Sequence, residues 1–117
     1  MENVHGNVLV VEDDADCGGM IAEVLDHEGF SVHLVNNRNE AASALQHSLY
    51  EYIVLDVFMH GMPIEEFLKL AGAQRPNTII ISAVVDAKAV AKKLGASAWL
   101  RKPFDHEQLL GAIRAAG

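Results

Sequence analysis

Five short apolar runs recur along this chain, with longer and more polar segments between them. The runs are residues 8–11, 32–35, 52–55, 78–81 and 98–100, and most are rich in valine and isoleucine. They are mostly continuous rather than alternating, which is typical of strands that are covered on both faces. The runs therefore predict a parallel sheet with a layer of structure on each side.

The segments between these runs carry apolar residues at helical spacing. Three helices are marked by Met20, Ile21, Val24 and Leu25, by Ala41, Ala44, Leu45 and Leu49, and by Ile64, Phe67, Leu68 and Ala71. Gly29 would stop the first helix. A fourth covers residues 86–94, with Asp86 as its cap and Gly95 as its terminator, and a fifth begins near Asp105. The alternation predicts an α/β fold, a flavodoxin-like (βα)5 doubly wound sandwich whose five-stranded parallel sheet has the order 2-1-3-4-5.

The composition limits the classes of function. With 117 residues, half of them hydrophobic, we expect one domain over residues 1–117. A formal net charge of −7 argues against nucleic-acid binding, and the single cysteine, Cys17, excludes an intrachain disulfide and a multi-cysteine zinc site. Without a secretion signal or an apolar run of ~20 residues, a cytoplasmic protein without a membrane span is expected. Any output domain would lie beyond this chain or on another one.

Polar residues stand where the predicted strands end. Glu12 and Asp13 follow the first run, Asp56 the third, Ser82 the fourth and Lys102 the fifth. In a doubly wound sheet, ligands collect beyond the carboxyl ends of the strands. Carboxylates that are pushed together repel one another, and a hard cation relieves the repulsion. Carboxylate, water and phosphate oxygens suit Mg²⁺ far better than zinc, so the pattern predicts a Mg²⁺ site.

Four motifs at these strand ends carry a family resemblance. They are the acid pair after LVV, the Asp in YIVLD, the Ser-Ala in IIISA and the Lys-Pro-Phe in GASAWLRKPF. In this order they resemble the response-regulator receiver domain of two-component signalling, from about Asn7 to Ala115. The resemblance implies a signalling phosphoacceptor rather than an enzyme. Asp56 would accept a phosphoryl group from a phosphohistidine on a sensor histidine kinase or phosphotransfer protein, as part of a phosphorelay.

The resemblance also implies a metal site at Asp56. Asp13 would bind Mg²⁺ directly, Glu12 would act largely through a water, and the backbone carbonyl of Phe58 would supply another oxygen. Phosphoryl transfer asks the protein for little covalent chemistry beyond a nucleophile, so alignment and neutralising cations supply most of the catalysis. Without the resemblance, acids at these positions would be read as a solvated loop next to a helix cap. Asp14 fits that simpler role.

Three further roles follow from the resemblance. Lys102 would pair with Asp56 before the reaction and with the phosphoryl oxygens afterwards, and Ser82 would donate its hydroxyl to the phosphoryl group. The bond between Lys102 and Pro103 would be cis. Trp99 stands where receivers carry an aromatic residue that turns inward when the hydroxyl engages the phosphoryl group. The alternative for Trp99 is plain core packing.

The loop after the acceptor departs from the family. Receivers usually read Met-Pro, any residue, Met-Asp-Gly, whereas this chain reads DVFMHGMPI, with His60 in place of the proline and Pro63-Ile64 in place of Asp-Gly. Gly61 still tolerates positive φ, so a different loop path is expected. The resemblance also implies that the residues two positions after Asp56 and Ser82 control the access of water to the acyl phosphate. Here they are the apolar Phe58 and Val84, which cannot orient a water. Slow self-dephosphorylation is therefore predicted.

Two hypotheses for function remain. In the first, phosphorylation shifts a two-state equilibrium and changes binding of a downstream partner or output domain at the face formed by the fourth helix, fifth strand and fifth helix. A dimer linked to phosphorylation is one form of this. In the second, the chain is a degenerate receiver that serves only as an interaction or dimerisation module. A Mg²⁺-dependent hydrolase is disfavoured, because Phe58 stands where such enzymes carry a second acid.

Overall fold

A computed structural model describes residues 6–74, 76–83 and 86–117. These residues form five parallel strands, β1 (Asn7–Val11), β2 (Ser31–Val35), β3 (Tyr52–Asp56), β4 (Asn77–Ser82) and β5 (Ala98–Arg101). They also form the α-helices α1 (Ala15–His27), α2 (Arg38–His47), α3 (Ile64–Ala71), α4 (Ala87–Leu94) and α5 (His106–Ala116), with a short 3-10 helix, η1 (Gly72–Gln74). The strand order is β2-β1-β3-β4-β5, so the predicted order is confirmed.

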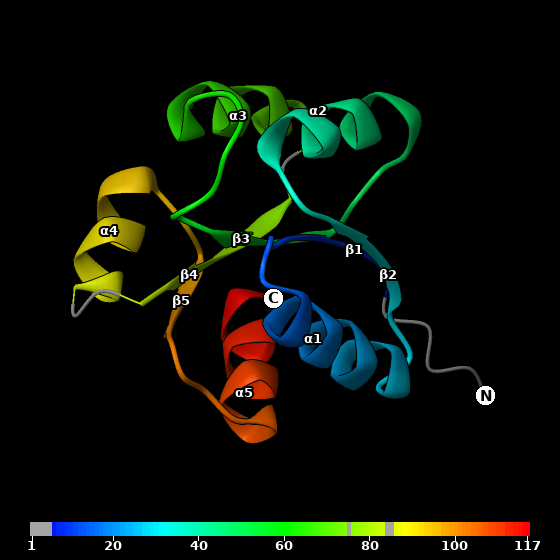
Figure 1. The fold of residues 1–117 in the computed structure, drawn as a ribbon, viewed down its shortest axis with the longest axis vertical. Helices are drawn as coiled ribbons and strands as arrows, with labels where there is room; N and C mark the ends of the chain where they lie inside the picture. The colour runs from blue at the N-terminus through cyan, green and yellow to red at the C-terminus, as the bar shows by residue number, and fades with distance from the viewer. Residues whose placement is uncertain (1–5, 75, 84–85) are drawn as a thin grey trace.

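The sheet separates two hydrophobic layers. Figure 1 shows α1 and α5 on one face of the sheet and α2 and α3 on the other, with α4 beside β4 and β5. Side chains of β1 alternate between the layers, since Val8 and Val10 pack against α1 and α5 whereas Leu9 and Val11 pack against α2 and α3. The doubly wound arrangement expected from the apolar runs is therefore present.

Cover on both faces holds for the inner strands only. The four residues of β1 from Val8 to Val11 and those of β3 from Ile53 to Asp56 are all buried. At the edges, β2 is largely exposed, and β5 alternates between buried and exposed residues. An edge strand has a neighbour on one side only, so continuous apolar sequence does not guarantee complete burial there.

Most predicted helix ends are confirmed. Asp14 caps α1 by accepting from the backbone N–H of Asp16 at 3.2 Å, and Gly29 and Gly95 adopt positive φ after α1 and α4. Asp86 occupies the cap position of α4, but its side chain makes no capping hydrogen bond. The second helix was predicted to reach Leu49, which is wrong. It ends at His47, and Leu49 is 76% exposed in the loop.

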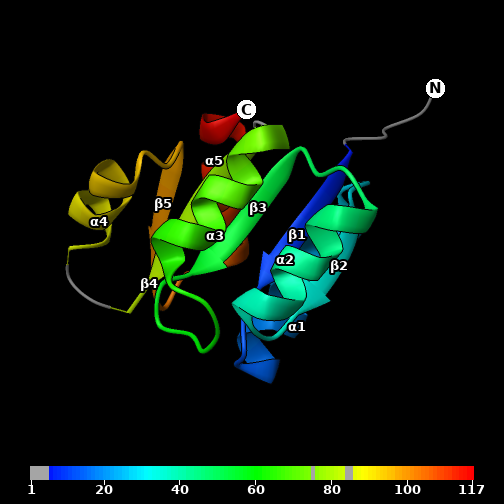
Figure 2. The same ribbon diagram turned by 90° about the horizontal axis from the view of Figure 1, so that it is seen from above.

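All five strands run the same way, so their carboxyl ends lie along one edge of the sheet. Figure 2 shows β1, β2 and β3 side by side with their arrowheads toward that edge. The residues that follow β1 and β3 are therefore neighbours in space, although more than forty positions lie between Glu12 and Asp56 in the chain. In the described part of the chain, no helix has the length and apolar character to cross a membrane.

Candidate functional site

Three carboxylates meet at the carboxyl edge of the sheet. Val11 and Leu55 are partners in the register of β1 and β3, so the residues that follow them come out side by side. One oxygen each of Glu12, Asp13 and Asp56 lies within 4.8 Å of the others. Glu12 and Asp56 are buried and Asp13 is exposed. The cluster therefore combines two buried carboxylates with a third that faces solvent.

The ammonium of Lys102 reaches the two buried carboxylates. Its Nζ lies 2.7 Å from Asp56 Oδ2 and 2.7 Å from Glu12 Oε1. Lys102 follows β5, and its backbone N–H donates to the carbonyl of Ser82 at 2.8 Å, which ties the end of β5 to the end of β4. The bond between Lys102 and Pro103 is cis, as predicted. One ammonium thus contacts two buried carboxylates, and a third carboxylate, that of Asp13, lies beside them.

Burial and the neighbouring charges together shift the pKa values of two of these groups. Burial raises the pKa of Glu12 above its ordinary value, the Lys102 ammonium and the Asp14 amide oppose the rise, and the nearby Asp56 adds to it. Partial burial alone would lower the pKa of Lys102, but Asp56 and Glu12 outweigh it and raise that pKa. The two partners therefore respond differently to the same contact. The raised pKa of Lys102 favours its charged form, whereas the raised pKa of Glu12 makes its carboxylate form less favourable, because of desolvation and the like-charged neighbour Asp56.

Both oxygens of Asp56 have partners. Oδ2 accepts from Lys102, and Oδ1 accepts from the backbone N–H of Phe58 at 2.9 Å. The Phe58 side chain is 61% exposed at the rim of the site. The Asp56 carboxylate is therefore held in one orientation between a strand-end lysine and the first residues of the loop between β3 and α3.

The cluster fits a divalent cation. Glu12 Oε1 is buried and, although it contacts the Lys102 ammonium, it is not aligned for a hydrogen bond with any described group. Three carboxylates against one ammonium leave an excess of negative charge, and buried charge is stable only when it is compensated. Oxygen donors in this number suit Mg²⁺, which keeps water ligands and binds through few carboxylates.

The other predicted site residues lie around this centre. Ser82 is buried at the end of β4, next to Asp56 in the sheet since Asp56 pairs in register with Ile81. Trp99 is 44% exposed, and the Lys88 ammonium lies 5.5 Å from its ring centroid, so the plain core packing considered as an alternative does not apply. Val84, named for its effect on dephosphorylation, lies outside the described residues.

One residue near the site was not anticipated. Arg38, at the start of α2, is only 7% exposed, and its guanidinium donates to three carbonyls of the loop after Asp56. Backbone carbonyls leave no mark in the sequence, and an arginine in the first turn of a helix has the composition of a surface position. The one available signal was the departure of that loop from the family pattern.

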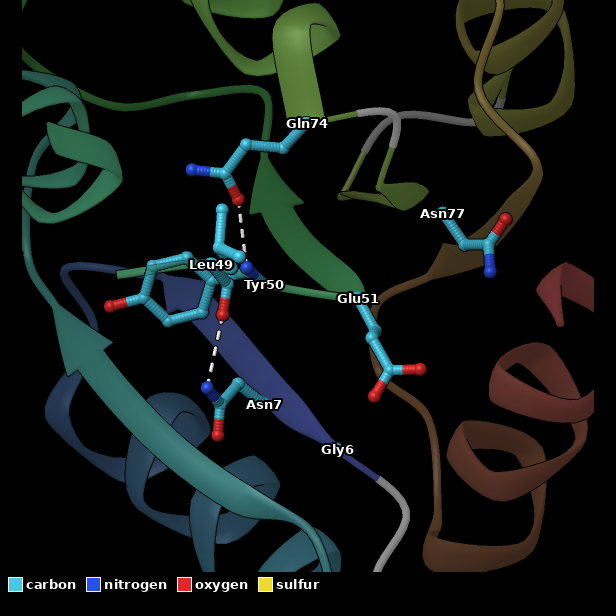
Figure 3. Close-up of a pocket in the computed structure, with 7 residues that line it drawn as sticks. All are labelled: Gly6, Asn7, Leu49, Tyr50, Glu51, Gln74 and Asn77. Carbon is cyan, nitrogen blue, oxygen red and sulfur yellow. Dashed lines mark hydrogen bonds between the residues drawn. The ribbon is translucent and has the colours of Figure 1, made fainter. Parts of the chain in front are cut away.

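A separate hollow of about 500 Å³ lies at the opposite, amino-terminal edge of the sheet. Figure 3 shows Gln74 accepting from the Tyr50 N–H and Asn7 donating to the Leu49 carbonyl, at 2.7 and 3.0 Å. The Gln74 amide also donates to the carbonyls of Leu45 and Ser48 at 2.9 Å. The side-chain amides of Gln74 and Asn7 are thus hydrogen-bonded to the surrounding backbone. Among the residues that line the hollow, there is no cluster of charges like that at the carboxyl edge.

Comparison with known proteins places these features in a family context. The family model described as "Response regulator receiver domain" matches residues 8–114. The transcriptional regulatory protein PcoR of Escherichia coli is 32% identical over 111 residues, covering 92% of this chain and 49% of that protein. The transcriptional regulatory protein FixJ of Bradyrhizobium diazoefficiens is 34% identical over 115 residues, covering 95% of this chain and 56% of that protein.

A solved structure agrees with the sequence relatives. The chemotaxis response regulator CheY4 of Vibrio cholerae superposes with a TM-score of 0.85 at 26% identity, covering 96% of this chain and 98% of that one. The chain spans about half the length of the curated relatives PcoR and FixJ, and nearly all of the CheY4 chain.

Proposed function

This chain belongs to the family of response regulator receiver domains, the signalling modules of two-component systems, and we propose that it accepts a phosphoryl group on Asp56. The observation that carries the proposal is the placement of one Asp56 oxygen against the Lys102 ammonium and the other against the Phe58 amide, beside two further carboxylates. Receivers interact with histidine kinases and with output domains, so the phosphoryl donor would be a phosphohistidine.

The transfer needs a nucleophile held in line with the donor. An Asp56 oxygen attacks the phosphorus, a P–O bond forms, the donor P–N bond breaks, and the imidazole leaves with a proton from solvent. The site is open to the donor at its exposed side, where Asp13 and Phe58 face solvent. Because the carboxylate is oriented in advance, little rearrangement is required before the attack.

The residues around Asp56 would share the charge of the transferred group. Lys102 would move its hydrogen bond from the carboxylate to a phosphoryl oxygen, which its flexible side chain allows. Ser82, at the end of β4, would donate its hydroxyl to another. Asp13, Glu12, Asp56 and the Phe58 carbonyl would hold Mg²⁺. A bound Mg²⁺ supplies positive charge that neutralises the phosphoryl oxygens during transfer.

The phosphorylated state would be read at the face formed by α4, β5 and α5. Engagement of Ser82 would pull on the end of β4, and Trp99 on β5 would turn inward from its exposed position. The partner at this face would be an output domain, a separate downstream protein or a second copy of the chain. We also propose that residues 1–117 act as one receiver domain and that it catalyses only its own phosphorylation and dephosphorylation.

The degenerate alternative is not favoured. A module that kept only its interaction role would have no need of two buried carboxylates, which are costly to desolvate and are retained here opposite one ammonium. The altered loop between β3 and α3 is compatible with a working acceptor, since its first amide lies on Asp56.

Intact-protein mass spectrometry after incubation with acetyl phosphate and Mg²⁺ tests the proposal. The wild-type protein should gain one phosphoryl group, and the gain should vanish with a chelator and in Asp56→Asn. Asp26→Asn, which changes an exposed acid on α1, is the matched control and should react like the wild type. A gain that persists in Asp56→Asn, or no gain in the wild type, would contradict the assignment.

A further inference from the structure

One buried arginine at the start of α2 holds the loop that follows Asp56. Arg38 Nε donates to the Met62 carbonyl at 2.6 Å, Nη2 to the Met59 carbonyl at 3.0 Å and Nη1 to the Val57 carbonyl at 3.4 Å. The planar guanidinium has donors in a fixed fork, so three bonds from one side chain hold three points of a loop in fixed relation.

These contacts bear on the acceptor through the peptide planes. The Val57 carbonyl and the Phe58 N–H belong to one planar peptide, whose carbonyl accepts from Arg38 and whose N–H donates to Asp56. The Met59 carbonyl belongs to the second peptide after it. The peptide in between carries the Phe58 carbonyl, so it is flanked on both sides by peptides that Arg38 holds.

Burying the Arg38 guanidinium carries a desolvation cost that its hydrogen bonds to the loop must offset. Among the described residues, the two ion pairs both belong to Lys102, so the Arg38 charge is balanced by carbonyl dipoles alone. A buried guanidinium without a carboxylate partner is expensive to desolvate. An apolar side chain would fill the same space between α2 and the loop more cheaply, but it could not fix the direction of the carbonyls.

Neighbouring contacts keep the loop within reach of Arg38. The Arg38 backbone N–H donates to the His60 carbonyl at 3.2 Å, and the Asn39 side chain accepts from the Met62 N–H at 2.9 Å. Gly61 has φ +109°, and a Cβ there would lie 2.9 Å from the backbone nitrogen of Arg38. The loop therefore lies directly against the first turn of α2. This close approach and the positive φ both require glycine at position 61.

We propose that Arg38 is a positioning residue for the acceptor site: its guanidinium fixes the Phe58 peptide units beside Asp56 and thereby sets the affinity of the acidic cluster for a divalent cation. This rests on the proposed function, since it assigns the cluster to cation binding. The effect acts through the loop 57–62, since Arg38 itself makes no hydrogen bond or ion pair with Asp56, Glu12 or Asp13 in the described part of the chain.

The test compares two ways of weakening the fold. Arg38→Met removes the fork beneath the loop, whereas Gln74→Ala removes a side chain that makes three backbone contacts at the opposite edge of the sheet. Arg114→Met, on the exposed face of α5, controls for loss of one positive charge. For each variant, thermal unfolding, calorimetric binding of Mg²⁺ without phosphodonor, and hydrogen exchange of the Phe58 amide in metal-free protein are measured.

Arg38→Met and Gln74→Ala should both unfold at lower temperature. Of these two variants, only Arg38→Met should weaken Mg²⁺ binding, by roughly tenfold, as is typical when a residue that orients metal ligands is removed. It alone of the two should also speed hydrogen exchange of the Phe58 amide. Arg38→Lys keeps the charge without the fork and should fall between Arg38→Met and the wild type. Asn39→Ala, which removes one anchor from an exposed position, should give a smaller change in the same direction and serves if Arg38→Met does not fold.

Equal Mg²⁺ affinity and equal Phe58 exchange in the folded Arg38 and Asn39 variants and the wild type would overturn the proposal. So would an equal loss of affinity in Gln74→Ala, because the effect would then follow stability alone. If the wild type bound no Mg²⁺, the proposed function would fail, and the exchange of the Phe58 amide would still decide whether Arg38 positions the loop.

Discussion

The two edges of the sheet use polar side chains in opposite ways. At the amino-terminal edge, the Gln74 amide has both its donor and acceptor groups engaged by backbone, and Asn7 is tied to the Leu49 carbonyl. At the carboxyl-terminal edge, two buried carboxylates share one ammonium, and a buried Glu12 oxygen has no aligned hydrogen bond. The same apolar strands connect the two edges.

This difference distinguishes polar side chains that stabilise the fold from charged side chains that can bind a ligand. Neutral amides that satisfy backbone groups contribute to stability and have nothing left to offer a ligand. Charges that are gathered and only partly compensated destabilise the empty site, but a cation or a phosphoryl group can use them. A cavity at the first edge is therefore part of the framework, while the cluster at the second edge is the place for chemistry.

The largest effect is expected from removing the ammonium that contacts both Glu12 and Asp56. Lys102→Met should slow phosphorylation by acetyl phosphate by about a hundredfold, because one preorganised charge on the transferring group is lost. The initial rate of mass gain measures this, with Lys69→Met on the exposed side of α3 as control. A rate within twofold of the wild type would remove Lys102 from the mechanism.

The next effect belongs to the amino edge and should appear in stability alone. Gln74→Ala leaves the Tyr50 N–H and two carbonyls without their partner, so the free energy of unfolding should fall by about 1–3 kcal/mol. Urea unfolding measures it. The phosphorylation rate of the folded variant should equal that of the wild type, and a parallel loss of rate would mean that the two edges are not independent.

A smaller effect is expected at the rim of the site. Phe58 is exposed two positions after Asp56 and cannot orient a water toward the acyl phosphate. Phe58→Asn supplies an amide that can, and it should shorten the phosphoryl half-life roughly several-fold, less than the ~100-fold or more of a positioned acid or base, because an amide orients the water without taking its proton. Decay of the phosphorylated mass after removal of the donor measures it. A half-life that is barely altered would count against the idea that apolar residues keep the phosphoryl group long-lived.

The smallest effect concerns the pH dependence of stability. The pKa of Glu12 is raised in the folded protein, so its ionisation opposes folding, and this cost grows as the pH rises through the ordinary carboxyl pKa toward the folded value. Glu12→Gln should therefore be more stable than the wild type at pH 7 and lose this advantage as the pH falls below the ordinary value. Unfolding midpoints at pH 7 and pH 3 test this, and a variant less stable at pH 7 would show that the contact with Lys102 outweighs the burial.

The sequence predicts the framework and the strand-end residues well because both depend on local patterns. Continuous valine and isoleucine runs define the strands, and parallel order brings Glu12, Asp13 and Asp56 to one edge. It fails where the outcome depends on partners far along the chain. The loop after α2 is tied by Asn7 to the Leu49 carbonyl and by Gln74 to the Ser48 carbonyl, and Arg38 is buried against three loop carbonyls; all of these are tertiary contacts. Periodicity does not register such contacts.

The most direct measurement locates the phosphoryl group. After reaction with acetyl phosphate and Mg²⁺, borohydride reduces an aspartyl phosphate to homoserine, and tandem mass spectrometry of the digested protein identifies the position. Homoserine is expected at position 56 alone. Reduction at position 13, or a phosphorylated protein with Asp56 intact, would contradict it.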